Sequence, residues 1–122
     1  MALVGYRARV TRMWWWPFGR VPEVTAAQLR ERLERGDDLQ LVDVRTGHEF
    51  NQDHLPGAVS IPITELAHRI DELDPSRTTV LICRTAHRSV GGVRLLTDRD
   101  FRDVQQLAAG MQAWWRLERG LE

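Results

Sequence analysis

The chain is 122 residues long, with 43% hydrophobic and 28% charged residues, a composition typical of one globular domain with its own core. Its 17 basic residues, all of them arginine, balance 17 acidic residues, so the net charge gives no indication of a nucleic-acid partner. A single cysteine excludes an intramolecular disulfide, and the histidines lack the spacing of a zinc site. No apolar run approaches the roughly 18 residues of a membrane span, so the cytoplasm is the expected compartment.

Residues 1–20 differ from the rest of the chain because they combine several arginines with Trp14, Trp15 and Trp16 and contain no acidic residue. Their apolar centre is too short for a signal peptide, and no small-residue cleavage site follows it. We expect an N-terminal arm that packs its aromatic side chains on the domain or on a second subunit. Weak contact with a membrane interface is the alternative. A start at Met13 stays open, and the domain itself is expected over residues 21–122.

The first predicted elements of the domain are a helix and a strand. Thr25 suits the N-cap of a helix that carries Leu29 and Leu33 at helical spacing and ends at Gly36. Residues 39–44, with the sequence LQLVDV, are rich in residues that favour strands.

Three further elements are predicted next. Glu49 and Phe50 fall on a short helix, and residues 58–61 form a short strand after the turn-rich segment HLPG at 54–57. Another helix is predicted to begin at Thr64, with one face that carries Leu66, Ile70 and Leu73.

The second half of the chain alternates strands with helices. Residues 78–82 form an apolar run that predicts a central strand of a parallel sheet. A helix from Ser89 to about Thr97, a strand at 104–107 and a helix at 111–118 follow. The alternation predicts an α/β fold, in which a parallel sheet lies between helices on both faces.

In such folds ligands bind beyond the carboxyl ends of the strands. Asp43, Arg45 and Cys83 all fall at predicted strand ends. A lone cysteine in that position is most often a small buried apolar residue. Here, however, it begins the polar loop CRTAHRS, whose other residues are Arg84, Thr85, Ala86, His87, Arg88 and Ser89.

A strand, a short loop and a helix in succession gather backbone N–H groups around one point, and this arrangement binds anions. Such surroundings favour the thiolate form of Cys83, which is the nucleophilic form. Arg84 and Arg88 add positive charge, and Ser89 can cap the following helix or donate a hydrogen bond to the thiolate.

The length of this loop separates sulfur chemistry from phosphate chemistry. Four residues lie between Cys83 and Arg88, whereas the signature of cysteine phosphatases has one residue more. The shorter loop has room for one extra sulfur atom on the cysteine, but little room for a tetrahedral phosphate. Phosphoryl transfer and arsenate reduction are therefore disfavoured.

From about Val21 to its C-terminus the chain resembles the rhodanese-like sulfurtransferase family in its single-domain form. The resemblance rests on several motifs in a fixed order, namely LVDVR at 41–45, EF at 49–50, HLPGAVSIP at 54–62, VLIC at 80–83 with its loop, and LAAGM at 107–111 leading to Trp114. It implies a three-layer α/β fold, in which a parallel sheet of about five strands is flanked by helices on both faces.

The resemblance also implies a double-displacement reaction. Cys83 would take a sulfane sulfur from thiosulfate or another persulfide donor and become a persulfide, which a thiol (or cyanide) acceptor then removes. The amides of residues 84–88 would stabilise the persulfide, and Arg84 and Arg88 would attract the anionic donor. Metal and organic cofactors are not implied. The acceptor that the resemblance implies would be a thiol, either a small molecule or an acceptor protein.

Four other residues receive supporting roles from the resemblance. Asp43 and Arg45 match an Asp-x-Arg element, and a structural ion pair is favoured over direct catalysis. Asp43 would hold an active-site arginine or a loop N–H, and Arg45 would pair with a nearby acid. His54 belongs to a structural turn, whereas His87 either meets the acceptor or is simply exposed to solvent.

Ala86 departs from the family pattern, which often has glycine in this place. If the position requires a positive φ, alanine costs about 1 kcal/mol relative to glycine and changes the donor preference. The alternative function is a non-catalytic interaction or regulatory module with the same fold. Such modules commonly lack the cysteine, whereas this chain retains Cys83 with two flanking arginines.

Overall fold

The computed structural model describes residues 20–121, so the predicted arm lies outside the described residues except for Arg20. Five parallel strands form one sheet in the order β1-β5-β4-β2-β3. The strands are β1 (Glu23–Val24), β2 (Leu39–Asp43), β3 (Val59–Ser60), β4 (Thr78–Ile82) and β5 (Val104–Leu107). The helices are α2 (Ala26–Glu34), α3 (Gly47–Gln52), α4 (His87–Asp98) and α5 (Gly110–Glu118), with two 3-10 helices, η1 (Leu66–His68) and η2 (Ile70–Glu72).

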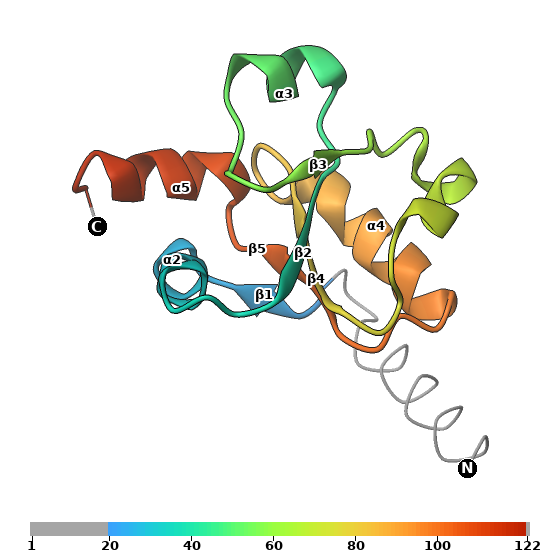
Figure 1. The fold of residues 1–122 in the computed structure, drawn as a ribbon. Coiled ribbons are helices and arrows are strands. Elements are labelled where there is room, and N and C mark those ends of the chain that lie inside the picture. Colours follow the sequence, from blue (N-terminus) through green and yellow to red (C-terminus); the bar gives the residue numbers. More distant parts are fainter. Residues whose placement is uncertain (1–19, 122) are drawn as a thin grey trace.

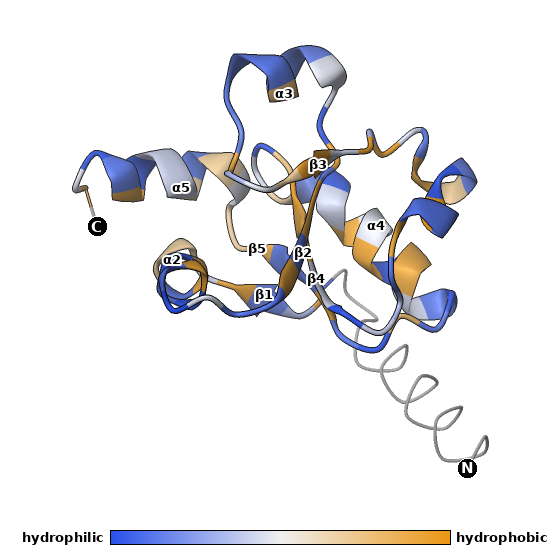
Figure 2. Ribbon diagram, viewed as in Figure 1, coloured by the Kyte–Doolittle hydropathy of each residue, from blue (hydrophilic) through white to orange (hydrophobic). Residues whose placement is uncertain are grey.

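The sheet lies between two layers of helices, which confirms the expected three-layer α/β fold (Figure 1). Helices α2 and α5 cover one face, and α4 covers the other together with η1 and η2. The central strands β2 and β4 are mainly hydrophobic, whereas the helices around the sheet carry both hydrophobic and hydrophilic residues (Figure 2). Along β4 successive side chains alternate between the layers, so Val80 and Ile82 pack on the α5 side, whereas Leu81 packs on the α4 side.

Most of the predicted elements are confirmed, with ends shifted by one or two residues. Thr25 caps α2 as predicted, because its side chain accepts a hydrogen bond from the Gln28 N–H while the Gln28 side chain accepts one from the Thr25 N–H. The central position of β4 is also confirmed, since it pairs with β2 on one side and with β5 on the other. This strand is buried from Thr79 to Ile82.

The helix predicted to begin at Thr64 is wrong, because residues 66–72 form two separate 3-10 helices. Hydrogen bonds such as that from the His68 N–H to the Glu65 carbonyl span three residues rather than four. The predicted spacing of apolar residues contains one step of three and one of four, which both kinds of helix accommodate. Arg69, at a φ of −119°, separates the two turns and binds the carboxylates of Glu65 and Glu72.

Strand β1 was not predicted, because its two residues are too few for an alternating pattern. It forms only through its pairing with β5, in which Glu23 lies beside Gln106. No helix in residues 20–121 is long and apolar enough to cross a membrane.

Candidate active site

The carboxyl ends of β2 and β4 lie side by side, because Asp43 and Ile82 are partners in the sheet. The chain therefore brings Asp43, Arg45 and the loop after Ile82 to the same edge, as the sequence predicted. Cys83 follows β4 directly, is only 1% exposed and belongs to the apolar cluster on the α4 side of the sheet. Its sulfur thus lies on the face of the sheet opposite to α5.

Helix α5 holds the loop from the opposite face. The Met111 N–H donates to the Cys83 carbonyl at 2.7 Å, and the Gln112 N–H donates to the Arg84 carbonyl at 3.1 Å. In a trans peptide the C=O and the following N–H point in opposite directions. The N–H groups of Arg84 and Thr85 consequently point away from α5, toward the side of the sheet that holds the Cys83 side chain.

In the described part of the chain, these loop amides find no hydrogen-bond acceptor. Among the described residues, no hydrogen bond uses a backbone N–H of residues 84–88 as its donor. Unsatisfied N–H groups at the start of a helix, such as α4, attract negative charge. The loop is therefore a set of free donors beside a buried sulfur.

Gly110 is the residue that allows α5 to approach the loop so closely. A Cβ atom built on it would lie 2.2 Å from the Cys83 carbonyl oxygen and 2.6 Å from the Arg84 carbonyl carbon. Its φ of +59° is also in the region that favours glycine. No other residue fits here while the hydrogen bonds from α5 to the loop stay in place.

Ala86 adopts a left-handed conformation, with φ 74° and ψ 10°, at the residue that precedes α4. This confirms that the position requires the positive φ for which glycine is the usual choice. The loop therefore contains local strain of about 1 kcal/mol relative to a glycine loop.

Ser89 lies in the first turn of α4 and belongs to a chain of hydrogen bonds that runs from the buried Cys83 to the exposed Glu23. Its Oγ is 3.4 Å from the Cys83 sulfur and donates to the Gln106 side-chain carbonyl at 2.6 Å. The Gln106 amide in turn donates to the Glu23 carboxylate at 2.7 Å. A carboxylate only accepts hydrogen bonds, so Glu23 must bind the NH2 group of the Gln106 side chain. The side-chain oxygen of Gln106 then faces Ser89, and the Ser89 hydroxyl donates its proton to that oxygen.

The Ser89 oxygen consequently offers lone pairs to the Cys83 S–H, which differs from the cap or donor expected from the sequence. Ala86, not Ser89, is the N-cap residue of α4. Neither Gln106 nor Glu23 was a candidate residue in the sequence. The available signal was the pair of glutamines in the predicted strand at 104–107, since an amide that faces the core needs polar partners.

Arg88 is bound by Glu49 of α3. The two side chains form a bidentate pair, with N–O distances of 2.8 and 3.1 Å. The Arg88 hydrogen bonds lower the pKa of Glu49 to about 2, and Glu49 raises the pKa of Arg88. The positive charge of Arg88 is thus offset by a neighbour, whereas Arg84 is exposed and has no carboxylate partner among the described residues.

Asp43 and Arg45 form an ion pair with each other, and both side chains are almost fully buried. The Arg45 guanidinium donates to the Asp43 carboxylate at 2.7 Å and to the Asp53 carbonyl at 2.6 Å. The partner of Asp43 is therefore Arg45 rather than a group of the loop. This pair ties the end of β2 to the segment that follows α3, which is the geometry of a scaffold.

The two histidines lie in different surroundings. His54 stacks on Phe50 with ring centroids 3.7 Å apart, and its Nδ1 is 2.8 Å from the Phe50 carbonyl oxygen, as suits a structural turn. His87 is exposed at the start of α4, where its Nδ1 is 2.8 Å from the Thr85 hydroxyl. Within residues 20–121, no cluster of three His, Cys, Asp or Glu side chains could hold a metal ion.

A hollow of about 340 Å³ lies beside the loop, on the outer side of α5. It is lined by Arg84, Gln112, Trp115, Arg116 and Arg119. This hollow was not predicted from the sequence. The helical spacing of the last four residues, at positions 112, 115, 116 and 119, was the signal that places them on one face.

The strain at Ala86 gives the first prediction. Replacement of Ala86 by glycine should raise the free energy of unfolding by about 1 kcal/mol, because glycine adopts the positive φ without steric cost. Chemical denaturation measures this difference. The matched control is Ala27→Gly on the exposed face of α2, which should lower stability by about 1 kcal/mol. A loss of stability for Ala86→Gly equal to that of the control would contradict the assigned strain.

The close contact at Gly110 gives the second prediction. Gly110→Ala should destabilise the protein by roughly 2–4 kcal/mol, because the new methyl group overlaps the loop backbone and alanine resists a positive φ. The control is Gly36→Ala, which has a φ of +80° but no atom within 4 Å of the added Cβ. Denaturation of both variants separates the steric contact from the backbone conformation. An equal loss of stability in the two variants would show that a methyl group at position 110 does not clash with the loop backbone.

The Glu49–Arg88 pair gives a prediction about pH. A carboxylate whose pKa is lowered on folding stabilises the protein above its ordinary pKa of 4.5, and this contribution is lost as the pH falls toward about 2. The stability difference between the wild type and Glu49→Gln should therefore be constant from about pH 7 to 5 and shrink between about pH 4.5 and 2. Glutamine keeps the capping box with Thr46 while it removes the charge.

Denaturation of both proteins across this pH range provides the measurement. The pair is partly exposed to solvent, so the expected difference at neutral pH is modest, about 1 kcal/mol or less. A difference that already disappears between pH 7 and 5 would mean that Arg88 does not hold Glu49 ionised.

Comparison with known proteins places this geometry in a family. A family model described as the rhodanese-like domain matches residues 25–117. The chain is 32% identical to the thiosulfate sulfurtransferase GlpE of Shewanella oneidensis over 83 residues, which cover 68% of this chain and 82% of GlpE. A crystal structure of a rhodanese-related protein from Thermoplasma volcanium, 25% identical, superposes with a TM-score of 0.72 over 82% of this chain and 94% of that one.

Other relatives are longer than this chain. An HTH-type transcriptional regulator of Mycobacterium tuberculosis is 42% identical over 93 residues, which are 75% of this chain but only 40% of the regulator. The putative sulfur carrier protein YrkF of Bacillus subtilis is 29% identical over 94 residues, 77% of this chain and 51% of its own. The chain thus spans about half, or less, of these two relatives. Through its family match, its fold and the loop that follows β4, the chain belongs to the rhodanese-like domain family.

Proposed function

We propose that the chain is a sulfurtransferase that carries a sulfane sulfur on Cys83 as a persulfide. The observation that carries this proposal is that the amides of residues 84–88 donate to no acceptor among the described residues, and that α5 turns those of Arg84 and Thr85 toward the side of the buried sulfur. Preorganised N–H donors stabilise an anion at this position without further reorganisation. The name of the GlpE relative, a thiosulfate sulfurtransferase, supports thiosulfate as a donor.

The proposed loading step forms one sulfur–sulfur bond and breaks another. The Cys83 thiolate attacks the outer sulfur of thiosulfate, the bond between the two thiosulfate sulfurs breaks, and sulfite leaves with the electron pair. A persulfide anion on Cys83 remains, and the loop amides and the start of α4 are the donors that face it. The Ser89 oxygen, 3.4 Å from the Cys83 sulfur, accepts from the S–H before the thiol loses its proton.

Arg84 is the group that attracts the anionic donor in this proposal. It is exposed, follows Cys83 directly and has no carboxylate partner in the described part of the chain. Arg88 acts differently from its expected role, because its bidentate bond to Glu49 leaves it to hold α3 against α4. His87 stands at the rim of the loop, where an acceptor would arrive.

A regulatory or interaction module is the second candidate function. The similarity to an HTH-type transcriptional regulator favours it, since the part shared with this chain is less than half of that protein. The two functions differ in whether Cys83 accepts sulfur, so one experiment separates them.

The test is incubation of the reduced, folded protein with thiosulfate, followed by intact mass spectrometry. The wild type should gain one sulfur atom, which cyanide then removes as thiocyanate. Cys83→Ser is the control and should gain none. Absence of the adduct with thiosulfate and with a polysulfide donor would refute the transferase proposal and leave the interaction module. Hydrolysis of an aryl phosphate instead would point to phosphatase chemistry.

A further inference from the structure

A hydrogen-bond chain connects a charged group at the surface of the molecule to the buried nucleophile. Cys83, Ser89 and Gln106 are 1%, 0% and 3% exposed, and they form its inner part. The Ser89 oxygen lies 3.4 Å from the Cys83 sulfur and 2.6 Å from the side-chain oxygen of Gln106. The Gln106 nitrogen lies 2.7 Å from the carboxylate of Glu23, which is exposed on the edge strand β1. Two buried side chains thus couple Glu23 to the sulfur.

The Glu23 carboxylate gives this hydrogen-bond chain a single direction. Because it only accepts, the NH2 group of Gln106 faces Glu23 and the Gln106 oxygen faces Ser89. Ser89 has one hydroxyl proton, and it donates that proton to Gln106. Only lone pairs of the Ser89 oxygen then face the Cys83 sulfur. They accept from the S–H of a thiol but repel the charge of a thiolate, so Ser89 favours the thiol.

Reversal of this direction is unfavourable while Glu23 is a carboxylate. If the Ser89 proton turned to a thiolate, two oxygens 2.6 Å apart would face each other and the buried Gln106 oxygen would lose its donor. Rotation of the Gln106 amide would supply a new donor to Ser89. The same rotation would place the Gln106 oxygen against the Glu23 carboxylate, where neither group has a proton to donate.

We propose that Glu23 is a positioning residue that keeps Ser89 an acceptor toward Cys83 and thereby holds the nucleophile in its thiol form to a higher pH. The inference rests on the proposed function only for its effect on sulfur loading, since ionisation of Cys83 is measured without any sulfur donor. The loop amides and the start of α4 act in the opposite direction, because they favour the thiolate. Glu23 thus limits the fraction of Cys83 that is in the reactive form.

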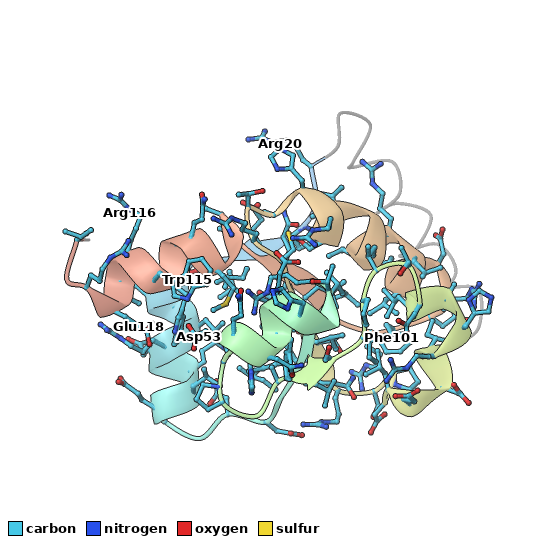
Figure 3. All side chains as sticks on the ribbon, turned by 90° about the horizontal axis from the view of Figure 1, so that it is seen from above. Arg20, Asp53, Phe101, Trp115, Arg116 and Glu118 are labelled. Carbon is cyan, nitrogen blue, oxygen red and sulfur yellow. The ribbon has the colours of Figure 1, made fainter. Side chains whose placement is uncertain are left out.

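The other charged groups near Cys83 lie outside this hydrogen-bond chain. Seen from above, helices α3, α4 and α5 lie around the loop that follows β4 (Figure 3). The charged side chains that face the site from the loop, α4, α3 and β2 are Arg84, Arg88, Glu49, Asp43 and Arg45. The part of α5 that binds the loop, at Met111 and Gln112, has no charge. Replacement of Glu23 therefore leaves all of these charges in place.

Glu23→Gln tests the proposal directly. Glutamine keeps the shape of glutamate but can donate as well as accept, so Gln106 becomes free to rotate and to release the Ser89 proton to the thiolate. The ultraviolet absorbance of the thiolate reports ionisation of the only cysteine, with Cys83→Ser as the baseline. The midpoint of ionisation should fall by about one pH unit, as expected for one hydrogen bond to a charged group. An unchanged or higher midpoint would overturn the proposal.

A second pair of variants separates the hydrogen-bond chain from simple electrostatics, since loss of a negative charge also favours a thiolate directly. In Ser89→Ala protein the hydrogen-bond chain is interrupted, so addition of Glu23→Gln should leave the midpoint in place. A full shift in this background would mean that Glu23 acts through its charge alone. Glu34→Gln, at an exposed acid of α2, is the control for net charge and should not move the midpoint. An equal shift in this control would likewise contradict the proposal.

The pH dependence of sulfur loading from thiosulfate provides a second readout. Below the wild-type midpoint, Glu23→Gln should load roughly threefold faster, because its larger thiolate fraction outweighs the weaker nucleophilicity of a less basic thiolate. Above both midpoints it should load more slowly by a similar factor. A variant that only disturbed the structure would be slower at every pH, and this result would contradict the proposal.

The two readouts also distinguish this inference from the proposed function. If the midpoint shifts as expected but neither protein takes up sulfur, the positioning role of Glu23 stands and the sulfurtransferase proposal is wrong. If both proteins load sulfur with coinciding pH profiles, the positioning role is wrong and the sulfurtransferase proposal stands.

Discussion

The hydrogen bonds from α5 to the carbonyls of Cys83 and Arg84 are the interaction on which the rest of the site depends. They turn two peptide groups so that their N–H donors face the other side of the sheet. Only a glycine at position 110 permits this approach. The loop in turn requires a left-handed backbone conformation at Ala86, which is unfavourable for alanine. Two helices on opposite faces of the sheet, α4 and α5, therefore fix the conformation of one short loop.

The charges near the loop are arranged in two groups that serve different purposes. Asp43 and Arg45 form an ion pair that is almost fully buried. Desolvation offsets much of the electrostatic attraction in such a pair, so its main role is to fix the segment that follows α3. Arg88 is likewise bound by Glu49. Positive charge without a partner in the described residues is concentrated on the α5 side, where Arg84 connects the loop to the hollow.

Much of this arrangement could be predicted from the sequence, because local patterns determine it. The cap at Thr25 and the apolar run of β4 each depend on a few adjacent residues, whereas the positive φ at Ala86 was suggested by the glycine that the family often has there. The turns around Arg69 and the two-residue strand β1 depend on tertiary packing, so sequence spacing gave a wrong helix and no strand there. The hydrogen bonds between Ser89, Gln106 and Glu23 join three distant segments, and local patterns do not reveal such contacts.

This last chain of contacts bears on where the functional unit begins. The family match covers residues 25–117, and it includes the whole loop but not Glu23. The acid that orients Gln106, and through it the hydroxyl beside the sulfur, therefore lies before the start of the shared domain. Arg119, at the outer end of the hollow, lies just after its end. A fragment cut at the family boundaries would keep the nucleophile and lose both the fixed orientation of its nearest polar neighbour and one wall of the hollow.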